Sequence, residues 1–309
     1  MRSQTLVAFL ETGLFDVLAD APSSVARIGS CLDISPPAVA RLLSLGEACG
    51  LIERHGELVA LTTRGLVAAR EPGVRAMIRH GTLLHADLVG WRAVLEGRGE
   101  GELARFWPYS GGPGRPEEYS QLMRESLSLV AEPLLDTVNF DRFETILELG
   151  GGDASLAVMI ARNYSKPSIR VLDLPAVAPL ADARIRAAGL IERVTFQARD
   201  NRAPQLASHD CVLMLRLLHD LDDGAAITLL RQAKESLAPA GIAIVGEPTR
   251  RAGRDAQSAY FTAYFGAMGS GRLRTRAQIE DLANQTGLTL VRNRRTGNSL
   301  LTVLEFGHH

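Results

Sequence analysis

The sequence predicts an α/β fold in which a mostly parallel sheet ends in an antiparallel hairpin and a mostly helical, winged-helix domain comes first. In the second half, short apolar runs alternate with apolar residues at helical spacing, which is typical of parallel strands covered on both faces. The last two apolar runs, 288–294 and 299–305, are joined by a short Gly-containing turn and predict the hairpin. The five predicted parallel strands are 146–149, 169–172, 193–196, 210–215 and 241–246.

Two domains are expected, a dimerisation domain with a helical linker at 1–97 and a ligand-binding domain at 98–309. Residues 4–20 are apolar around much of a predicted helix. A helix with so little polar face needs burial, and the first 70 residues look too small to provide it. We therefore expect a homodimer formed through the first domain.

The winged-helix pattern comes from two predicted helices, 25–32 and 37–49, followed by short strands at 50–54 and 58–61. Such domains often bind DNA through the second helix. Here that helix carries a single positive residue, Arg41, whereas a DNA-reading helix needs several phosphate contacts. We expect no nucleic-acid partner.

Composition narrows the class of protein. The 309 residues are 46% hydrophobic and 22% charged, with a net charge of −1, which gives no support for a nucleic-acid or membrane-surface role. No apolar run approaches the roughly 18 residues that span a bilayer. The three cysteines are widely spaced and form no metal-type pair. We expect a cytoplasmic protein with reduced thiols, no metal site and no integral membrane association.

The most informative segment is Ile-Leu-Glu-Leu-Gly-Gly-Gly-Asp at 146–153, a strand that enters a glycine loop before a helix. Glycines allow a cofactor to approach the backbone closely. Glu148 and Asp153 flank the loop, and no Lys or Arg lies between Arg142 and Arg162. Carboxylates would repel a pyrophosphate but attract an amino group and a sulfonium. The loop therefore predicts S-adenosylmethionine rather than a dinucleotide.

Further acids are predicted to hold the cofactor. Asp173 ends the second strand, 21 residues after Gly152, at the spacing where such an acid reaches ribose hydroxyls. A cap at a helix start is the alternative role. Asp200 follows the third strand, where it is placed either to accept from an adenine amino group or to cap a loop.

His219 follows the fourth apolar run, 211–218, at the strand end where open α/β sheets bind ligands. A neutral imidazole accepts a proton from a hydroxyl near neutral pH. Asp220 is its neighbour, and Glu247 ends the adjacent fifth strand, from which it could orient the imidazole. These three residues are the expected catalytic group. Met123, Tyr264 and Met268 are the expected acceptor-pocket residues, with ordinary core packing as the alternative.

With these motifs in this order, the chain resembles the S-adenosylmethionine-dependent O-methyltransferases that carry an N-terminal winged-helix dimerisation domain, a family of plant phenolic and bacterial natural-product enzymes. The resemblance implies a Rossmann-like class I methyltransferase sheet, with His219 as general base and Glu247 assisting. His85-Ala-Asp-Leu and Met268-Gly-Ser-Gly-Arg look most like the bacterial hydroxyneurosporene-type carotenoid branch. The cofactor-binding residues expected on this basis are Glu148, Gly150, Gly151, Gly152, Asp173, Leu174, Asp200, Asn201 and Arg216.

Two positions depart from the family pattern. Ala154 stands where a glycine usually follows the loop, and Leu273 stands where an acid often precedes the Arg-Thr pair. The sequence thus predicts methylation of a hydroxyl on a hydrophobic small molecule. The alternatives are carbon, nitrogen or sulfur methylation on the same scaffold, a nicotinamide-dependent oxidoreductase, or a winged-helix regulator that senses a ligand.

Overall fold

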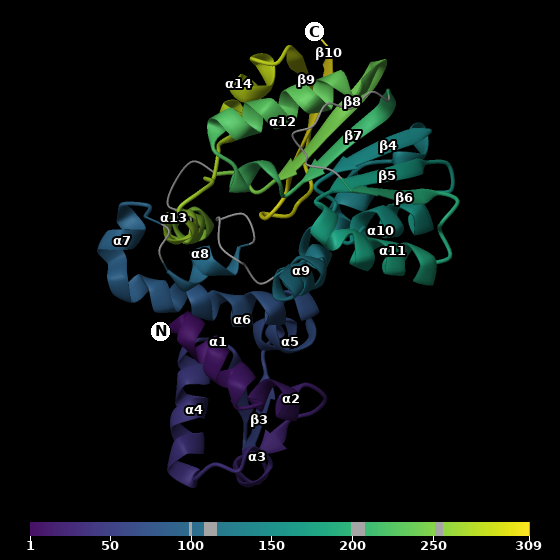
Figure 1. Cartoon of the computed structure of the whole chain (residues 1–309). Coiled ribbons are helices and arrows are strands. Elements are labelled where there is room, and N and C mark those ends of the chain that lie inside the picture. The colour runs from purple at the N-terminus through teal and green to yellow at the C-terminus, as the bar shows by residue number, and fades with distance from the viewer. Residues whose placement is uncertain (99–100, 108–115, 199–207, 251–255, 309) are drawn as a thin grey trace. The chain divides into compact units, whose positions relative to one another are not determined.

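A computed structural model of the chain divides into two compact units, Met1–His85 and Ala86–His309, which are described separately (Figure 1). The residues that the structure describes are 1–98, 101–107, 116–198, 208–250 and 256–308. Along these residues, no helix is both long enough and apolar enough to cross a membrane.

The first unit is mostly helical and contains the predicted helix pair and hairpin. Its small antiparallel sheet has the strand order β1-β3-β2. The elements are α1 (Arg2–Glu11), α2 (Leu14–Leu18), β1 (Ser23–Ser24), α3 (Val25–Leu32), α4 (Pro36–Ala48), β2 (Ile52–His55), β3 (Leu58–Leu61), α5 (Thr63–Arg70) and α6 (Pro72–Asp87), which runs on into the second unit.

The predicted helix at 4–20 is broken into α1 and α2. Gly13 adopts a φ of 80°, a left-handed conformation that ends one helix and begins the next. Phe9, Phe15 and Leu18 then turn into the unit's own core, where each is at most 2% exposed. The burial that the sequence analysis assigned to another subunit is therefore provided largely within the chain.

The second unit begins with helices that precede its sheet and ends with the hairpin strands. Its first elements are η1 (Leu88–Gly90), α7 (Trp91–Leu95), α8 (Glu102–Phe106), α9 (Pro116–Thr137) and η2 (Phe140–Arg142). The strands are β4 (Thr145–Leu149), β5 (Ser168–Asp173), β6 (Val194–Ala198), β7 (His209–Leu215), β8 (Leu237–Glu247), β9 (Leu288–Arg294) and β10 (Thr302–His308). The remaining helices are α10 (Ser155–Asn163), η3 (Pro175–Val177), α11 (Ala178–Ala187), η4 (Leu218–Asp220), α12 (Asp223–Glu235), α13 (Ala256–Met268) and α14 (Arg276–Asn284).

The seven strands form one sheet in the order β6-β5-β4-β7-β8-β10-β9. Strands β4 to β8 pair in parallel, as the alternation of strands and helices predicts. β10 lies antiparallel to both β8 and β9, which confirms the predicted hairpin. The antiparallel end follows from the short connection, because a parallel return would need a crossover of a dozen or more residues.

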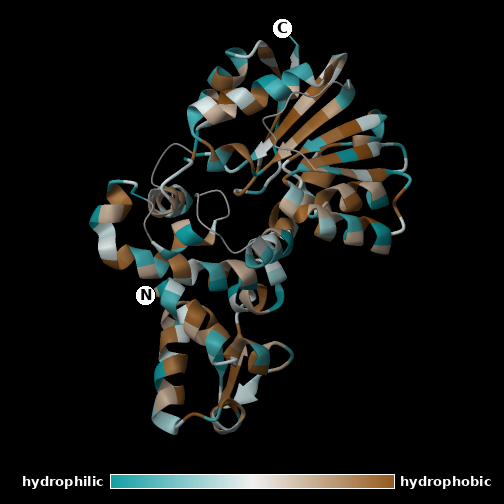
Figure 2. Cartoon of the chain, viewed as in Figure 1, coloured by the Kyte–Doolittle hydropathy of each residue, from teal (hydrophilic) through white to brown (hydrophobic). Residues whose placement is uncertain are grey.

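Helices cover both faces of this sheet (Figures 1 and 2). Successive strand residues point to opposite faces, so Ile146 and Leu213 pack with α9, α10 and α11, whereas Leu147 and Met214 pack with α12 and α14. Burial on both faces explains why these strands are continuous apolar runs rather than alternating ones. It also favours the strand ends as positions for the polar side chains of a site.

The carboxyl ends of the central strands provide those positions. Because β4, β5, β7 and β8 are parallel neighbours, their last residues meet at one edge of the sheet. Glu148, Asp173 and Glu247 all stand at or next to these ends and are buried. The topology thus brings together acids that lie up to 99 residues apart in the chain.

The first unit offers a test of its packing. A Cβ added at Gly65 in α5 would lie 2.0 Å from the Leu51 carbonyl oxygen, whereas nothing lies within 4 Å of one at Gly81 in α6. Gly65→Ala should therefore cost about 1–3 kcal/mol of unfolding free energy, as overpacking does. Gly81→Ala should be neutral or slightly stabilising, because alanine favours helices. Urea unfolding of both variants checks this, and equal stabilities would contradict the structure.

Candidate active site

The glycine loop after β4 has a backbone that requires small residues. Gly150 and Gly152 adopt φ values of 68° and 55°, in the left-handed region. A Cβ at Gly151 would come within 2.7 Å of both Glu148 Cδ and Val171 Cγ1, whereas one at Gly152 would meet nothing within 4 Å. Ala154, which replaces the usual glycine, still adopts a φ of 63° as the N-cap of α10. The loop is therefore packed beneath Gly151 and open at Gly152.

Asp173 fixes this loop to the end of β5. Its Oδ2 accepts a hydrogen bond of 2.7 Å from the Gly152 amide, and its Oδ1 accepts one of 2.6 Å from the Leu174 amide. Burial raises the pKa of Asp173 although the two amides oppose the shift. A carboxylate oxygen accepts more than one hydrogen bond, so ribose hydroxyls can still be bound here, as the sequence predicts.

Glu148 is the buried acid beneath the loop. Its pKa is raised to about 8, mainly by burial and further by the nearby Asp173 and Asp153. A hydrogen bond from the Ala157 amide opposes this shift. Glu148 Oε2 is buried and has no hydrogen-bond partner among the described residues. An unpartnered buried acceptor next to an open glycine backbone fits a cofactor that carries positive charge. A pyrophosphate would fit poorly beside it.

Asp153, the other flanking acid, raises the pKa of Glu148 but is itself paired with two arginines. Its Oδ2 lies 2.8 Å from Arg184 Nη2 of α11 and 3.4 Å from Arg124 Nη1 of α9. Its Oδ1 accepts hydrogen bonds from the Ser155 amide and hydroxyl. The prediction of an unneutralised Asp153 is wrong, because Arg184 and Arg124 come from segments distant from the loop in the sequence. The acidity of the loop therefore depends on Glu148 and Asp173.

The chain turns sharply after β7 to present His219. β7 ends at Leu215, where the predicted strand 210–215 also ends, although the apolar run continues to Leu218, and Arg216 adopts a φ of 53°. The 3₁₀ turn η4 then carries His219. A left-handed non-glycine residue is strained, and such strain is often found at functional sites.

Glu247 and Asp220 flank the His219 ring. Glu247 Oε2 lies 2.5 Å from His219 Nδ1, while Glu247 Oε1 accepts hydrogen bonds from the amides of Leu217 (2.8 Å) and Leu218 (2.6 Å). Asp220 Oδ1 lies 3.3 Å from Nε2. Because Glu247 holds the Nδ1 proton, the lone pair of the neutral ring is placed on Nε2. The three residues predicted as the catalytic group thus lie together.

These carboxylates control the charge of the imidazole. Burial lowers the pKa of His219, and the positive charge of Arg216 lowers it further. Asp220 and Glu247 outweigh both effects, so the His219 pKa is raised above its ordinary value. Burial likewise raises the pKa of Asp220, and Glu247 adds to that shift against His219 and Arg216. The result is an imidazole that readily takes a proton and keeps it.

Arg274 holds the turn that carries His219 and was not identified as a site residue from the sequence. Its side chain is 2% exposed. It donates to the carbonyls of Leu218 (2.5 Å) and Leu221 (2.7 Å) and pairs with Asp223 at 2.7 Å. The Arg274-Thr275 pair was noted in the sequence, but a role for Arg274 could not be predicted from it because the hydrogen-bond partners of Arg274 lie up to 56 residues away. Arg274 therefore acts as a positioning residue.

Arg216, expected at the cofactor, directs its side chain to α9. Nη1 donates to Ser126 Oγ at 2.9 Å, and Nη2 donates to the Met123 carbonyl at 3.2 Å. Nη2 also lies 3.5 Å from Met123 Sδ. Arg216 thereby connects the end of β7 to the helix that carries Met123, one of the expected acceptor residues. Its contact with a cofactor remains a prediction.

The other two expected acceptor residues are buried on α13, one helical turn apart. Tyr264 packs against Trp107, with ring centroids 6.3 Å apart, and Phe265 packs against His219 at 5.7 Å. Burial raises the pKa of Tyr264 well above its ordinary value, so it stays neutral. Met268 lies four residues after Tyr264 and shares its face of the helix, where both are buried. Asp200 and Asn201 lie outside the described residues.

A Rossmann-like seven-stranded sheet with a glycine loop at the end of its first parallel strand and a histidine–carboxylate group at the end of its fourth is the arrangement of a class I methyltransferase. Residues 104–289 match the family model of the O-methyltransferase domain, and the chain belongs to this family. The family uses S-adenosylmethionine, and the protein is an S-adenosylmethionine-dependent methyltransferase.

Named relatives agree with this assignment. The chain is 33% identical over 304 residues to demethylspheroidene O-methyltransferase of Cereibacter sphaeroides, covering 94% of this chain and 80% of the relative. It is 31% identical to the Rhodobacter capsulatus enzyme of the same name, covering 98% and 78%. The solved structure of human N-acetylserotonin methyltransferase in complex with S-adenosylmethionine has the same fold, with a TM-score of 0.78 at 22% identity and coverage of 99% and 94%.

The raised pKa of Glu148 leads us to expect that cofactor binding is coupled to the release of a proton. With a pKa of about 8 the carboxyl is mostly protonated at pH 7, and a bound cation favours its ionised form. S-adenosylmethionine binding should therefore release a proton near pH 7, and affinity should rise with pH up to about 8. Calorimetry in buffers of different ionisation enthalpy measures this release.

Two variants separate this coupling from a general charge effect. Glu148→Gln should abolish the proton release, whereas Glu144→Gln, at a nearby side chain that is 75% exposed, should keep it. Because the pKa of Glu148 is raised in the folded state, its ionisation opposes folding increasingly between its ordinary value and about pH 8. Glu148→Gln should accordingly raise Tm at pH 8. Equal proton release in both variants would exclude Glu148.

Proposed function

We propose that this methyltransferase acts on a hydroxyl group of a hydrophobic or aromatic small molecule and that His219 is its general base. The observation that carries the proposal is the 2.5 Å contact between Glu247 Oε2 and His219 Nδ1 at the end of two adjacent parallel strands. A buried carboxylate that orients an imidazole is an arrangement that supports proton removal.

The His219 ring would take the hydroxyl proton at Nε2. A phenol, with an ordinary pKa near 10, is a weak nucleophile until it loses that proton. Glu247 keeps Nδ1 protonated and stabilises the positive ring that forms, and Asp220 adds a second nearby negative charge on the Nε2 side. Nitrogen or sulfur acceptors have less need of such a base, which favours oxygen as the methylated atom.

S-adenosylmethionine supplies an electrophilic methyl group when bound. The backbone at Gly150, Gly151 and Gly152, together with Glu148 and Asp173, would hold it beside the ends of β4 and β5. Leu174 supports Asp173 through its amide. Asp200, Asn201 and Arg216 are further proposed contacts. The role of these residues is to position the cofactor, since in-line transfer depends mainly on the alignment of the reacting atoms.

The proposed acceptor class follows from the side chains next to His219. Phe265 lies against the imidazole, and Tyr264 packs between Trp107 and Phe265 with ring centroids 6.3 and 5.7 Å apart. Met123 and Met268 would complete the acceptor wall with flexible thioether side chains, which adapt to apolar ligands. A highly charged acceptor such as a sugar phosphate would find little to bind there.

We also propose a cytoplasmic homodimer that pairs through the first domain, which the sequence analysis places at 1–97. Exposed apolar side chains on the first unit, Leu45 and Val67 among them, support pairing there. The cytoplasmic location rests on the reduced thiols expected for three widely spaced cysteines.

The base is tested by kinetics with a hydroxylated aromatic acceptor found by screening with isotopically labelled S-adenosylmethionine. His219→Ala should reduce kcat by about 10²–10⁴-fold and leave cofactor affinity unchanged, because the imidazole faces the acceptor. In the unaltered enzyme, kcat/KM should rise with pH through an apparent pKa above the ordinary histidine value, because only the neutral ring accepts a proton.

Paired variants test the role of Glu247. Glu247→Gln should reduce the rate less than His219→Ala, and the double variant should be little worse than His219→Ala alone, because the two residues act as one unit. The pH dependence should disappear in His219→Ala. Near-normal turnover of His219→Ala would overturn the proposal and point to nitrogen or sulfur methylation.

The homodimer is tested by light scattering at micromolar concentration, where a dimer is expected. The double variant Leu45→Glu/Val67→Glu should weaken it, because charge on a buried apolar contact is costly. Ile191→Glu, at a similarly exposed apolar position of the second unit, should leave the dimer intact. A monomer in the unaltered protein would contradict the proposal.

A further inference from the structure

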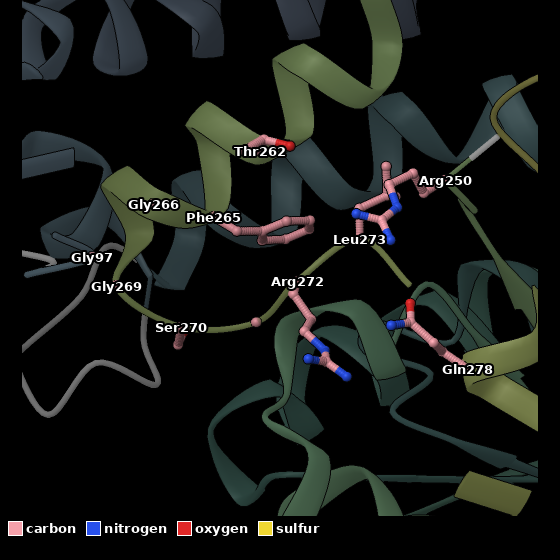
Figure 3. Close-up of a pocket in the computed structure, with 11 residues that line it drawn as sticks. Gly97, Arg250, Thr262, Phe265, Gly266, Gly269, Ser270, Arg272, Leu273 and Gln278 are labelled. Atoms are coloured by element: carbon pink, nitrogen blue, oxygen red, sulfur yellow. The ribbon is translucent and has the colours of Figure 1, made fainter. Parts of the chain in front are cut away.

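A cavity of about 400 Å³ lies in the second unit, apart from the glycine loop and lined on one side by Phe265, which also packs against His219 (Figure 3). It is bounded by α13, by the segment 269–273 that follows this helix, by Gln278 in the first turn of α14, and by Arg250 after β8. The volume suits a small organic molecule.

The polar groups around this cavity are mostly hydrogen-bond donors. The Arg250 guanidinium has no hydrogen-bond or ion-pair partner in the described part of the chain, although its amide is fixed at 2.8 Å to the Arg274 carbonyl. The Oε1 atom of Gln278 accepts a hydrogen bond from the Thr275 amide, so its side-chain NH₂ group is the part that can donate to a ligand. Arg272 adds a second guanidinium, paired with Asp223 at 2.7 Å.

Negative charge is missing from the lining. Its described residues include two arginines, Thr262, Ser270 and Gln278, but no aspartate or glutamate. Leu273 stands at the position where the sequence analysis noted the loss of an acid, and its side chain is 8% exposed. Together with the buried ring of Phe265 it supplies the apolar part of the lining, and Leu273 lies beside Arg250 (Figure 3).

We propose that this cavity is a second ligand site that binds a small carboxylate with an apolar, preferably aromatic, body. A guanidinium matches the two oxygens of a carboxylate in a bidentate pair, and the amide of Gln278 offers a further donor. The apolar body would lie against Phe265 and Leu273. Phe265 is shared with the proposed acceptor site, but ligand binding here does not depend on methyl transfer.

The site is physically connected to the base. The Arg272 amide donates to the His219 carbonyl at 2.8 Å, and a Cβ at Gly271 would lie 2.2 Å from the same oxygen. Phe265 contributes one edge to the cavity and packs with its ring 5.7 Å from the His219 ring. A ligand in this cavity would therefore contact Phe265 and the segment at Gly271 and Arg272, both of which pack against His219.

The test is a calorimetric titration of the full-length protein with benzoate, in the presence of saturating S-adenosylhomocysteine so that the cofactor's own carboxylate site is filled. Benzamide, neutral and nearly isosteric, is the matched ligand. Benzoate should bind saturably and benzamide at least about tenfold more weakly, which is the value of one charged hydrogen-bonded pair.

Two substitutions, each with a matched control, localise the binding. Arg250→Gln should weaken benzoate at least about tenfold, whereas Arg292→Gln, on exposed β9, should leave it unchanged. Leu273→Glu should abolish binding through charge repulsion and Leu273→Gln should not. Intact S-adenosylhomocysteine binding shows that each variant folds. Equal affinity for benzoate and benzamide, an unaffected Arg250→Gln protein, or no saturable binding would each overturn the proposal.

Discussion

The buried carboxylate of Glu247 is the interaction on which the site depends. One of its oxygens accepts from the two amides that begin the η4 turn, and the other holds His219 Nδ1. The same group therefore shapes the backbone and selects the tautomer of the ring. A 1% exposed carboxylate is stable only because each of its oxygens has hydrogen-bonded partners. Replacing it would disturb the geometry and the electrostatics of His219 at once.

Parallel strand pairing is what makes this interaction possible. β7 and β8 are neighbours with Leu215 opposite Gly246, so the residues that follow them meet beyond the sheet edge. The same edge holds Asp173, which connects the glycine loop to β5. The cofactor end and the base end of the site are therefore parts of one rigid sheet margin, and both are covered by helices on either face.

Arginines from distant segments determine how much charge remains at this margin. Arg184 and Arg124 neutralise Asp153, Arg216 connects β7 to α9, and Arg274 satisfies the carbonyls of the η4 turn. Glu148 beneath the loop has no arginine partner among the described residues, and burial together with the nearby Asp173 and Asp153 raises its pKa. A cationic cofactor would supply the positive charge that the Glu148 carboxylate lacks, which gives a physical reason for the loop to bind S-adenosylmethionine rather than a pyrophosphate.

Local pattern was sufficient to predict the strands, the glycine loop, the hairpin and the grouping of His219 with Glu247, because apolar periodicity, missing side chains and strand-end position are properties of short segments. It was insufficient for contacts between segments that are far apart, because periodicity specifies which face is buried and not what covers it. The break at Gly13, the pairing of Asp153, the role of Arg274 and the cavity beside Arg250 all depend on such contacts. Tertiary packing alone decided them.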